Sequence, residues 1–517
     1  MRTTNRLLHP AFLGLSALAS SLIALAACSD SLHLDPQPVP PGGTSSGAGG
    51  HGGGMGAPCE SSSDCAYPAS ICDTQKSECV ECLEHSNCSH QPGTVCSEGK
   101  CACPGEGESF CPSVGVAGQD GAQPARCASL STSQADCGSC GHACYGSCAE
   151  GACVDAWEPT SMNGAPSPRT LHAAVWTGSQ MIIWGGDSSG GVTNTGGVYD
   201  PVTRKWTATS LVNAPTPRRY ATAVWNGSKM IVWGGENGAA LDDGAMYDPA
   251  TNSWTTIPKP GGLLAARYLH TAVWTGSVMV VWGGYNASGN LGDGAKFDPA
   301  EGWSAVQIGG IYRRRQHSAV WAELESGRKE MIIFGGLGYD AIVAVDDVPL
   351  NTLGAYEPMA NIWASGSPGG TPPAARSAQT AVWTGTEMIV WGGRDAGANA
   401  LGDAARFDLA SFQWIAMAAS GLAPRWGHSA VWIGGDARRM VVWGGRDAAA
   451  TYFNNGGIYD PTADAWSLEM PTGPAARALH TAVVTADDKM IIWGGELGAN
   501  GAKTSTGAVF DLAKAAP

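Results

Sequence analysis

A pair of adjacent glycines recurs seven times in the C-terminal part of the chain and defines a repeat of about 50 residues. The first glycines of these pairs, 49 to 57 residues apart, are Gly185, Gly234, Gly283, Gly335, Gly392, Gly444 and Gly494. Each pair follows a methionine, two isoleucine or valine residues and a tryptophan or phenylalanine, as in Met181–Trp184. A short, continuous apolar run is typical of a β-strand that is buried on both faces. Because the repeats show no helical periodicity, we predict an all-β fold.

Three other positions recur with the glycine pairs. An aromatic residue and an acid follow each pair, as Tyr199-Asp200, Tyr247-Asp248, Phe297-Asp298, Tyr356-Glu357, Phe407-Asp408, Tyr459-Asp460 and Phe510-Asp511. A tryptophan follows the first six of them, as Trp206, Trp254, Trp303, Trp363, Trp414 and Trp466. The arginines that open the repeats are Arg169, Arg218, Arg267, Arg314, Arg376, Arg425 and Arg477. We expect these arginines, and the acids after the aromatic residues, to join neighbouring repeats through hydrogen bonds or ion pairs.

This pattern resembles the kelch repeat, whose unit is one four-stranded blade of a β-propeller. The resemblance covers residues 154–517, about 70% of the chain. It implies a seven-bladed propeller in which the apolar run is the second strand of each blade. The tryptophan then lies on the outer strand, and the two glycines let the backbone turn where neighbouring sheets crowd together.

The last repeat lacks an outer strand, because only six residues follow Phe510-Asp511. Trp157 lies twelve residues before Arg169, at the distance that separates Trp206 from Arg218. We therefore expect the segment around Trp157 to supply the outer strand of the last blade. Such pairing would close the ring and remove the open sheet edge between the first and last blades.

The first 27 residues are predicted to be a lipoprotein signal peptide. Arg2 and Arg6 precede a largely apolar stretch, residues 11–27, which ends in Leu-Ala-Ala directly before Cys28. This ending resembles the bacterial lipobox, and the resemblance implies that Cys28 is lipidated; an ordinary signal peptide with an incidental cysteine is the alternative. The stretch is at the short limit for a membrane span, so we expect the exported chain to meet the membrane only through its lipid. Ser29, in place of an acid, favours the outer membrane.

Cysteines and tryptophans divide the chain. All 17 cysteines lie at or before Cys153, and all 20 tryptophans lie at or after Trp157. Residues 28–58 are rich in glycine and proline and are predicted to be a tether. Residues 59–153 contain 16 cysteines but only eight isoleucine, leucine, valine, phenylalanine or methionine residues. We expect a disulfide framework to replace the missing hydrophobic core after export, with zinc sites as the alternative.

Two runs within this cysteine-rich region resemble known small modules. Residues 59–103 are similar to the cysteine-rich repeats of bacterial surface lipoproteins. Residues 127–153 resemble the cysteine module of stigma-specific proteins. Neither resemblance indicates a ligand, and the pairing of the cysteines does not follow from the sequence.

The charge of the chain argues against a nucleic-acid partner. The net charge is −15. Residues 1–153 hold 5 lysines and arginines against 14 acids, and residues 154–517 hold 25 against 31. Neither part has the basic excess that binding to a phosphate backbone requires.

No metal or other cofactor is expected. His172, His270, His317, His428 and His480 all lie three residues after the arginine that opens a repeat, with Ala221 and Gln379 at the other two equivalent positions. A position fixed by the repeat favours a structural role over a ring of metal ligands. Four residues before each repeat aromatic lies Thr195, Asp243, Asp293, Thr352, Asp403, Asn455 or Thr506. We expect these short polar side chains to form turns.

Specific function is expected where the repeats differ. Connections from the second to the third strand, and from one blade to the next, should emerge at the same end, because the four strands alternate in direction. Blade four departs most: Arg313, Arg314 and Arg315 open it, and its inner loop, residues 337–354, carries Tyr339, Asp340, Asp346 and Asp347. The residue after the glycine pair also varies, as Asp187, Glu236, Tyr285, Arg394, Arg446 and Glu496. Such a mixture suits binding of a glycan or protein partner, with a solvated surface lacking a ligand as the alternative.

The function predicted from these observations is that of a non-catalytic binding protein displayed on the cell envelope. Two alternatives remain, a carbohydrate-active enzyme of the sialic-acid mutarotase kind and a purely structural envelope protein. The copper–radical chemistry of galactose oxidase, another kelch protein, is excluded because it needs a cysteine joined to a tyrosine and no cysteine follows Cys153. Patterns typical of serine hydrolases, phosphate loops and zinc proteases do not occur.

Overall fold

The computed structural model describes residues 156–364, 367–467, 470 and 473–515, and the backbone of eight short strands between Ile71 and Cys153. The predicted signal peptide, the lipidation of Cys28, the tether and the bonding of the cysteine sulfurs lie outside the described residues. Within the ranges just given, no helix has both the length and the apolar character needed to cross a membrane.

The eight short strands pair as four antiparallel hairpins. They are β1 (Ile71–Asp73) with β2 (Glu78–Val80), β3 (Val95–Ser97) with β4 (Lys100–Ala102), β5 (Glu108–Cys111) with β6 (Arg126–Ser129), and β7 (Cys148–Ala149) with β8 (Ala152–Cys153). The backbone register of three hairpins sets cysteines opposite each other, namely Cys72 and Cys79, Cys96 and Cys101, and Cys148 and Cys153.

The described residues from Ala156 onward form seven four-stranded antiparallel sheets, numbered 1 to 7 in chain order with strands given from the inner edge outward. Sheets 1 to 4 are β11 (Ala173–Trp176), β12 (Met181–Trp184), β15 (Gly196–Asp200) and β16 (Lys205–Ala208); β17 (Thr222–Trp225), β18 (Met230–Trp233), β19 (Gly244–Asp248) and β20 (Ser253–Thr256); β21 (Thr271–Trp274), β22 (Met279–Trp282), β25 (Gly294–Asp298) and β26 (Gly302–Ala305); and β28 (Ser318–Glu323), β29 (Lys329–Phe334), β32 (Leu353–Glu357) and β33 (Ile362–Trp363). Sheets 5 to 7 are β34 (Thr380–Trp383), β35 (Glu387–Trp391), β36 (Ala404–Asp408) and β37 (Gln413–Ala416); β38 (Ser429–Ile433), β39 (Arg439–Trp443), β40 (Gly456–Asp460) and β41 (Ala465–Ser467); and β42 (Thr481–Val484), β43 (Lys489–Trp493), β44 (Gly507–Asp511) and β9 (Trp157–Pro159).

Shorter elements lie in the connections between these strands. They are β10 (Arg169–Thr170), β13 (Asp187–Ser188), β14 (Gly191–Val192), β23 (Tyr285–Asn286), β24 (Gly289–Asn290), β27 (Arg314–Arg315), β30 (Leu337–Asp340), β31 (Val345–Pro349), the 3₁₀ turn η3 (Gly261–Leu263) and the helix α1 (Leu512–Ala515). The kelch pattern and this all-β architecture together fit a β-propeller.

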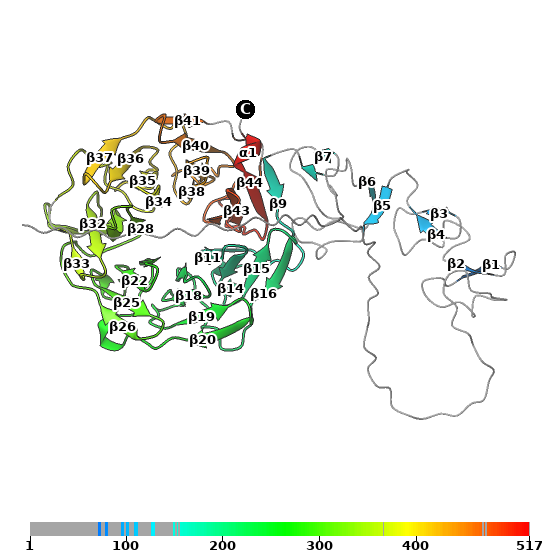
Figure 1. The fold of residues 1–517 in the computed structure, drawn as a ribbon, viewed down its shortest axis with the longest axis horizontal. Coiled ribbons are helices and arrows are strands. Elements are labelled where there is room, and N and C mark those ends of the chain that lie inside the picture. Colours follow the sequence, from blue (N-terminus) through cyan, green and yellow to red (C-terminus); the bar gives the residue numbers. More distant parts are fainter. Residues whose placement is uncertain are drawn as a thin grey trace, which may run out of the picture. The chain divides into compact units, whose positions relative to one another are not determined.

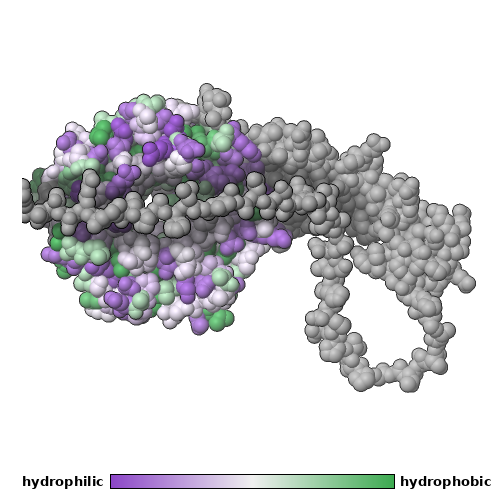
Figure 2. All heavy atoms as spheres, in the orientation of Figure 1, coloured by the Kyte–Doolittle hydropathy of each residue, from purple (hydrophilic) through white to green (hydrophobic). Residues whose placement is uncertain are grey.

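The sheets are arranged around a common centre (Figure 1). Strands β11, β28, β34 and β38 lie near the centre, and β16, β20, β26, β33 and β37 lie at the rim. Each inner strand contacts the inner strand of the next sheet, and β42 of sheet 7 contacts β11 of sheet 1. Hydrophilic and hydrophobic residues are interspersed over the visible surface of these sheets (Figure 2).

The hydrophobic core lies between neighbouring sheets. All four residues of β12 are buried. Ile182 belongs to a buried cluster with Met230 of sheet 2, whereas Ile183 belongs to another with Ile491 of sheet 7. Alternate residues of one strand therefore pack against opposite neighbours, which explains why this strand is apolar at every position.

The second glycine of each pair joins its sheet to the next one. Its N–H donates to the carbonyl oxygen of the following repeat arginine: Gly186 N lies 2.8 Å from Arg218 O, and Gly495 N lies 2.9 Å from Arg169 O, between sheets 7 and 1. Gly186 has a φ of +98°, and a Cβ at this position would lie 2.6 Å from the carbonyl oxygen of Thr170. Only glycine permits this approach, because a side chain would be both strained and in collision.

The fourth strand of sheet 7 comes from the other end of the described chain. Strand β9 pairs antiparallel with β44, and the register sets Trp157 opposite Phe510. This is the strand pairing that the spacing between Trp157 and Arg169 predicts. The Trp157 side chain is fully buried, with ring centroids 4.8 Å from Phe510 and 5.4 Å from Trp443.

Candidate functional site

The connections predicted to carry function meet at one end of the sheets, which we call the loop face. Strand β10 pairs with β13, which sets Thr170 opposite Asp187. The same register recurs in the other sheets, pairing Arg219 with Glu236, Tyr268 with Tyr285, Arg315 with Leu337, Ser377 with Arg394, Trp426 with Arg446, and Ala478 with Glu496. Each sheet therefore presents two residues, one after the repeat arginine and one after the glycine pair, on a backbone of constant geometry.

The seven repeat arginines form a buried frame beneath the loop face. In sheet 3, Arg267 donates from Nη1 to the carbonyl oxygens of Gly283 and Asp293, from Nη2 to the Asp293 carboxylate at 2.9 and 3.0 Å, and from Nε to Ala265 O. Each of the seven side chains is at most 1% exposed. Burial lowers the pKa of Arg314 to about 9, so this guanidinium still carries its charge at neutral pH.

Two polar positions of the repeat have partners other than those that the sequence predicts. Asp243, Asp293 and Asp403, expected to form turns, instead bind the repeat arginine of their own sheet. The acid after the repeat aromatic, expected to join neighbouring repeats, instead accepts from the turn that follows it: Asp200 Oδ1 lies 2.9 Å from Val202 N. The reason is local, because an acid at the start of a tight turn reaches the N–H groups two and three residues ahead. The arginine does join repeats, but through its backbone carbonyl.

The repeated histidines are internal links between sheets. His270 Nε2 lies 2.9 Å from the hydroxyl of Thr222 in the preceding sheet, and the other pairs are His172–Thr481, His317–Thr271, His428–Thr380 and His480–Ser429. All five are buried, and each ring packs edge-on against a tryptophan, as His270 does against Trp233. Burial, and then the nearby Arg267, lower the pKa of His270 to about 3. The structural role expected from their repeated position agrees with these contacts.

The hydrogen bond between a histidine and a hydroxyl of the preceding sheet is missing between sheets 1 and 2, because alanine occupies both positions. Ala173 occupies the hydroxyl position of sheet 1, and Ala221 the histidine position of sheet 2. We expect Ala173→Thr with Ala221→His to be more stable than the sum of the single changes by about 1 kcal/mol, the usual net value of one hydrogen bond. Urea unfolding of the wild type, the two single variants and the double variant measures this coupling. The native pair Thr271–His317, replaced by alanines in the same way, is the control, and a coupling near zero at the new pair would contradict the prediction.

The part of the loop face over sheets 1 and 2 is a chain of alternating charges. Arg219 lies 2.8 Å from Glu236 and 3.6 Å from Asp187, and Lys503 lies 3.0 Å from the other oxygen of Asp187. The hydrogen bond from Arg219 to Glu236 raises the pKa of the arginine further. These groups compensate one another, so this sector offers little unbalanced charge.

Aromatic rings follow over sheets 2 and 3. The ring centroids of Tyr220 and Tyr268 lie 6.1 Å apart, and those of Tyr268 and Tyr285 lie 5.7 Å apart. The guanidinium carbon of Arg315 lies 4.5 Å from the centroid of Tyr285. A row of partly exposed tyrosines suits contact with amphipathic ligands.

In sheet 4 the arginines and carboxylates picked out by the sequence do come together, but they pair with each other. Arg313 lies 2.8 Å from Asp346 and 4.8 Å above the ring of Tyr339, and Arg315 lies 2.5 Å from Asp347. Burial alone would raise the pKa of Asp346, but hydrogen bonds from Asn290 and Arg313 outweigh it and lower that pKa. The patch is thus largely neutralised from within.

Two predicted residues of this patch have other roles. Arg314 is a correction: it is fully buried and donates to Gly335, Tyr312 and Thr352, because it is the repeat arginine of sheet 4. Asp340 accepts from the N–H of Ile342 at 2.8 Å and so holds the turn between β30 and β31. That turn carries Ile342, which is 93% exposed.

Over sheets 5 to 7 the loop face is cationic and aromatic. Trp426 lies between two guanidinium groups, whose central carbons are 4.4 Å (Arg394) and 4.2 Å (Arg446) from its ring centroid. Arg446 lies 3.2 Å from Glu496 and 2.8 Å from the hydroxyl of Tyr452, which also bonds Glu496. Arg394 lacks such a partner among the residues from Ala156 to Ala515 that the structure describes.

A cavity of about 480 Å³ opens at the centre of the loop face. Tyr220, Gln316, Arg394, Trp426 and Arg446 line it, together with Leu171, Ala378, Gly427 and Leu479. Several of these residues lie two positions after a repeat arginine and have positive φ values near 55°, as in Leu171, Tyr220, Gln316, Ala378 and Leu479. Backbone hydrogen bonds join neighbours around the opening, for example from Tyr220 N to Leu171 O at 3.2 Å.

The repeat pattern identified one half of the loop face, the positions after the glycine pairs, but only Arg315 of the other half. It picked out the positions after the glycine pairs, among them Asp187, Glu236, Arg394 and Glu496. It missed Arg219, Tyr220, Tyr268 and Trp426, which lie one or two residues after a repeat arginine. The signal was present, because these positions vary between repeats as much as those after the glycines, but their opposition is visible only across the strand pairs.

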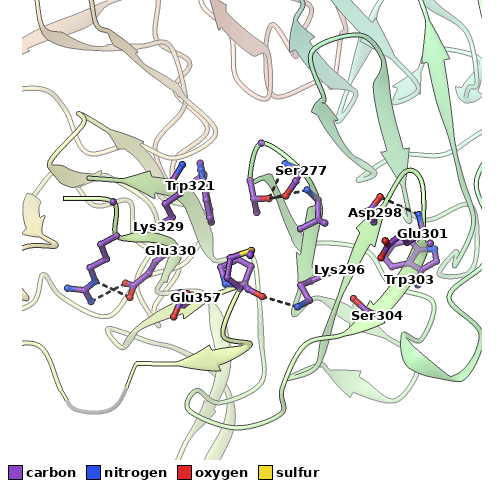
Figure 3. A pocket seen from close by; sticks show the side chains of 18 residues that line it. Ser277, Lys296, Asp298, Glu301, Trp303, Ser304, Trp321, Lys329, Glu330 and Glu357 are labelled. Atoms are coloured by element: carbon purple, nitrogen blue, oxygen red, sulfur yellow. Dashed lines mark hydrogen bonds and ion pairs between the residues drawn. The ribbon is translucent and has the colours of Figure 1, made fainter. Parts of the chain in front are cut away.

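A larger cleft, about 1080 Å³, lies at the end of the described sheets opposite the loop face, between sheets 3 and 4. The turn residue Ser277 and the strand residues Lys296 of β25 and Trp321 of β28 are among those that line it (Figure 3). Lys296 donates to Pro358 O at 2.9 Å, and Arg328 pairs with Glu330 at 3.0 Å. A similar groove of about 530 Å³ lies between sheets 7 and 1. Since such grooves recur where sheets diverge, the loop face remains the better candidate site.

Neither end of the described sheets holds three or more histidine, cysteine, aspartate or glutamate side chains that could together bind a metal ion.

Comparison with known proteins agrees with the repeat. The KLHDC2/KLHL20/DRC7 Kelch-repeats domain family matches residues 152–284 and 327–516. Among curated proteins, the chain is 28% identical over 145 residues to acyl-CoA-binding domain-containing protein 4 of Arabidopsis thaliana, covering 27% of this chain and 21% of that protein. It is 25% identical over 166 residues to the Rab9 effector protein with kelch motifs of Xenopus laevis (30% of this chain, 45% of that protein). Human Kelch domain-containing protein 3 is 30% identical over 145 residues (26% and 37%).

The chain therefore spans between about a fifth and somewhat under half of the length of these relatives. The family match, in contrast, extends over more than half of the chain and includes strands of all seven sheets, with a gap at residues 285–326. The chain belongs to the kelch-repeat family.

Proposed function

We propose that this kelch-repeat protein is a non-catalytic binding protein of the bacterial cell envelope. A lipid on Cys28 holds it in the outer membrane, and the tether of residues 28–58 separates the remainder of the chain from that membrane. The seven sheets are its blades, and β9 closes the ring. The loop face then binds a protein or glycan partner.

The observation that carries this proposal is the division between a constant frame and a variable surface. Beneath the loop face, the same arginine, glycine and histidine bonds recur from sheet to sheet. Above them, paired positions carry different residues in each sheet, from Arg219–Glu236 to Tyr268–Tyr285 and Trp426–Arg446. Ring stability requires the frame but places little demand on the identity of the exposed residues. A surface rich in arginine, tyrosine and tryptophan has the composition of binding sites.

The comparisons support binding in general terms. A kelch-repeat domain suggests a protein-interaction role, and one relative is named an effector of Rab9 with kelch motifs. The described residues also include an apolar projection next to the face, because Ile342 and Val343 at the β30–β31 turn are 93% and 59% exposed. Exposed apolar residues beside a polar patch are a common feature of interfaces.

Site-specific photo-crosslinking in the producing cells tests this function. A photoreactive phenylalanine derivative at Tyr285, on the loop face, is expected to give discrete crosslinked species. The same group at Met359, which is 89% exposed at the opposite end, is expected to give none. Cys28→Ser, which removes the lipid, should release the protein from the membrane fraction. Crosslinks from Met359 alone, or from neither position, would contradict the proposed face, and unchanged membrane binding of the Cys28 variant would contradict the anchor.

A further inference from the structure

The central cavity of the loop face contains a cation that forms no hydrogen bond or ion pair with the described side chains. Arg394 is partly buried, and its guanidinium stacks on Trp426. Neither a hydrogen bond nor an ion pair joins its side chain to another group in the described part of the chain. Other arginines of the loop face, such as Arg219, Arg313 and Arg446, each bind a carboxylate. Arg394 thus brings an unbalanced positive charge to a concave site.

The surroundings of Arg394 favour the binding of an anion to its guanidinium. Burial, and then the charge of Arg446, lower its pKa. Glu496 does not neutralise the charge of Arg394, because the Glu496 carboxylate is already bound by Arg446 and by the hydroxyl of Tyr452. A guanidinium in a site of reduced dielectric gains most from a planar, bidentate oxyanion such as a carboxylate.

The size and lining of the cavity restrict the molecule that carries the carboxylate. A volume of about 480 Å³ suits one or two sugar rings. Tyr220 lines the cavity, and Tyr268 lies next to it, so that aromatic rings flank the opening. The chain is acidic overall, with a net charge of −15, which disfavours ligands bearing many further negative charges. These features favour a small, singly charged, hydroxylated acid.

We infer that Arg394 and the cavity beside it bind the carboxylate of an acidic sugar, as a subsite of the proposed loop-face binding site, on which this inference rests. Arg394 would form the charge-assisted bonds, Trp426 would hold its guanidinium in place, and Tyr220 would contact the sugar ring. A carboxylate at the end of a peptide or on a glutamate side chain is the competing source of the same chemistry.

Isothermal titration of the full chain with glucuronate tests the inference, with glucose and N-acetylglutamate as comparison ligands. We expect glucuronate to bind and glucose to bind at least tenfold more weakly, because it lacks the charge. Arg394→Gln should raise the dissociation constant for glucuronate about 10- to 100-fold, the range for a hydrogen-bonded charge. Arg438→Gln is the matched control, because it removes the same charge from an exposed turn between β38 and β39, and it should leave the constant unchanged.

Three outcomes would overturn the inference. They are absence of glucuronate binding, equal binding by the Arg394 variant, and tighter binding of N-acetylglutamate, which would assign the subsite to a peptide. The Tyr285 crosslink separates this failure from failure of the proposed function. If that crosslink persists without glucuronate binding, the loop face still binds a partner and only the subsite is wrong. If both fail, the proposed function fails as well.

Discussion

Acidification from pH 7 to pH 5 is expected to destabilise the folded chain by about 2 kcal/mol for each buried histidine with a pKa near 3. Three of them, His172, His270 and His428, have pKa values lowered to about 3, and the pKa values of His317 and His480 are also lowered well below the usual value. In each case burial is the largest cause, followed by the neighbouring repeat arginine. The three alone amount to about 6 kcal/mol, a large share of the stability of most domains.

The direction follows from proton binding. The folded state keeps these imidazoles neutral, whereas the unfolded chain protonates them below about pH 6.5. The unfolded state therefore binds more protons between about pH 6.5 and pH 3, and the free energy of unfolding falls as the pH falls through this window. Carboxyl groups with lowered pKa values, such as that of Asp346, begin to contribute only at the acidic end of the range.

Urea unfolding at pH 7, 6 and 5 measures this effect, and His270→Gln identifies its source. Glutamine is the natural residue at the equivalent position of sheet 5, where Gln379 donates to Phe334 O at 2.7 Å. The variant should lose up to 1.4 kcal/mol per pH unit less than the wild type below pH 6. A matched control is His51→Gln, which changes a histidine that precedes the repeats in the sequence. If the slope with pH is the same in wild type and His270→Gln, the histidines are not the acid-sensitive groups.

Replacement of Trp157 with alanine is expected to cost about 3–5 kcal/mol of stability, the usual range for a buried tryptophan. The indole is 0% exposed and packs between Phe510 of its own sheet and Trp443 of sheet 6. It also anchors β9 against β44, the backbone pairing by which the described N-terminal strand of the sheets joins sheet 7. Its loss therefore removes core contacts and exposes the edge of β44.

Thermal unfolding of the full chain, followed by circular dichroism, measures this cost. Deletion of residues 154–160 should lower the melting temperature at least as much as Trp157→Ala. Trp363→Ala is the control: Trp363 holds the equivalent outer position of sheet 4, but its short strand β33 leaves it only partly buried. The control should cost clearly less. A Trp157→Ala variant as stable as the control would show that β9 adds little to the stability of sheet 7.

The repeat pattern predicted the elements well because each element is specified locally. Met181–Trp184 is apolar at every position, and the two glycines after it have positive φ values that other residues avoid. Even the pairing of β9 with β44 could be predicted, since an unmatched tryptophan at one end of the repeats corresponded to a missing one at the other.

The sequence alone could not decide which polar groups pair. Asp243 and Asp248 are both acids of one repeat, five residues apart, yet one binds Arg218 and the other accepts from the N–H of Ala250. The same limit applies to the binding face. Arg313 and Arg394 both depart from the repeat pattern. Asp346 neutralises Arg313, whereas no carboxylate of the described residues pairs with Arg394.

Strand order and the buried apolar strands were therefore determined by the sequence, because period, apolar runs and glycine positions act over a few residues. The partners of charged side chains, and with them the site that retains unbalanced charge, were decided by the tertiary structure. The physical reason is that electrostatic interactions depend on distances of a few ångströms between segments that are often remote in sequence, and only the packed sheets fix those distances.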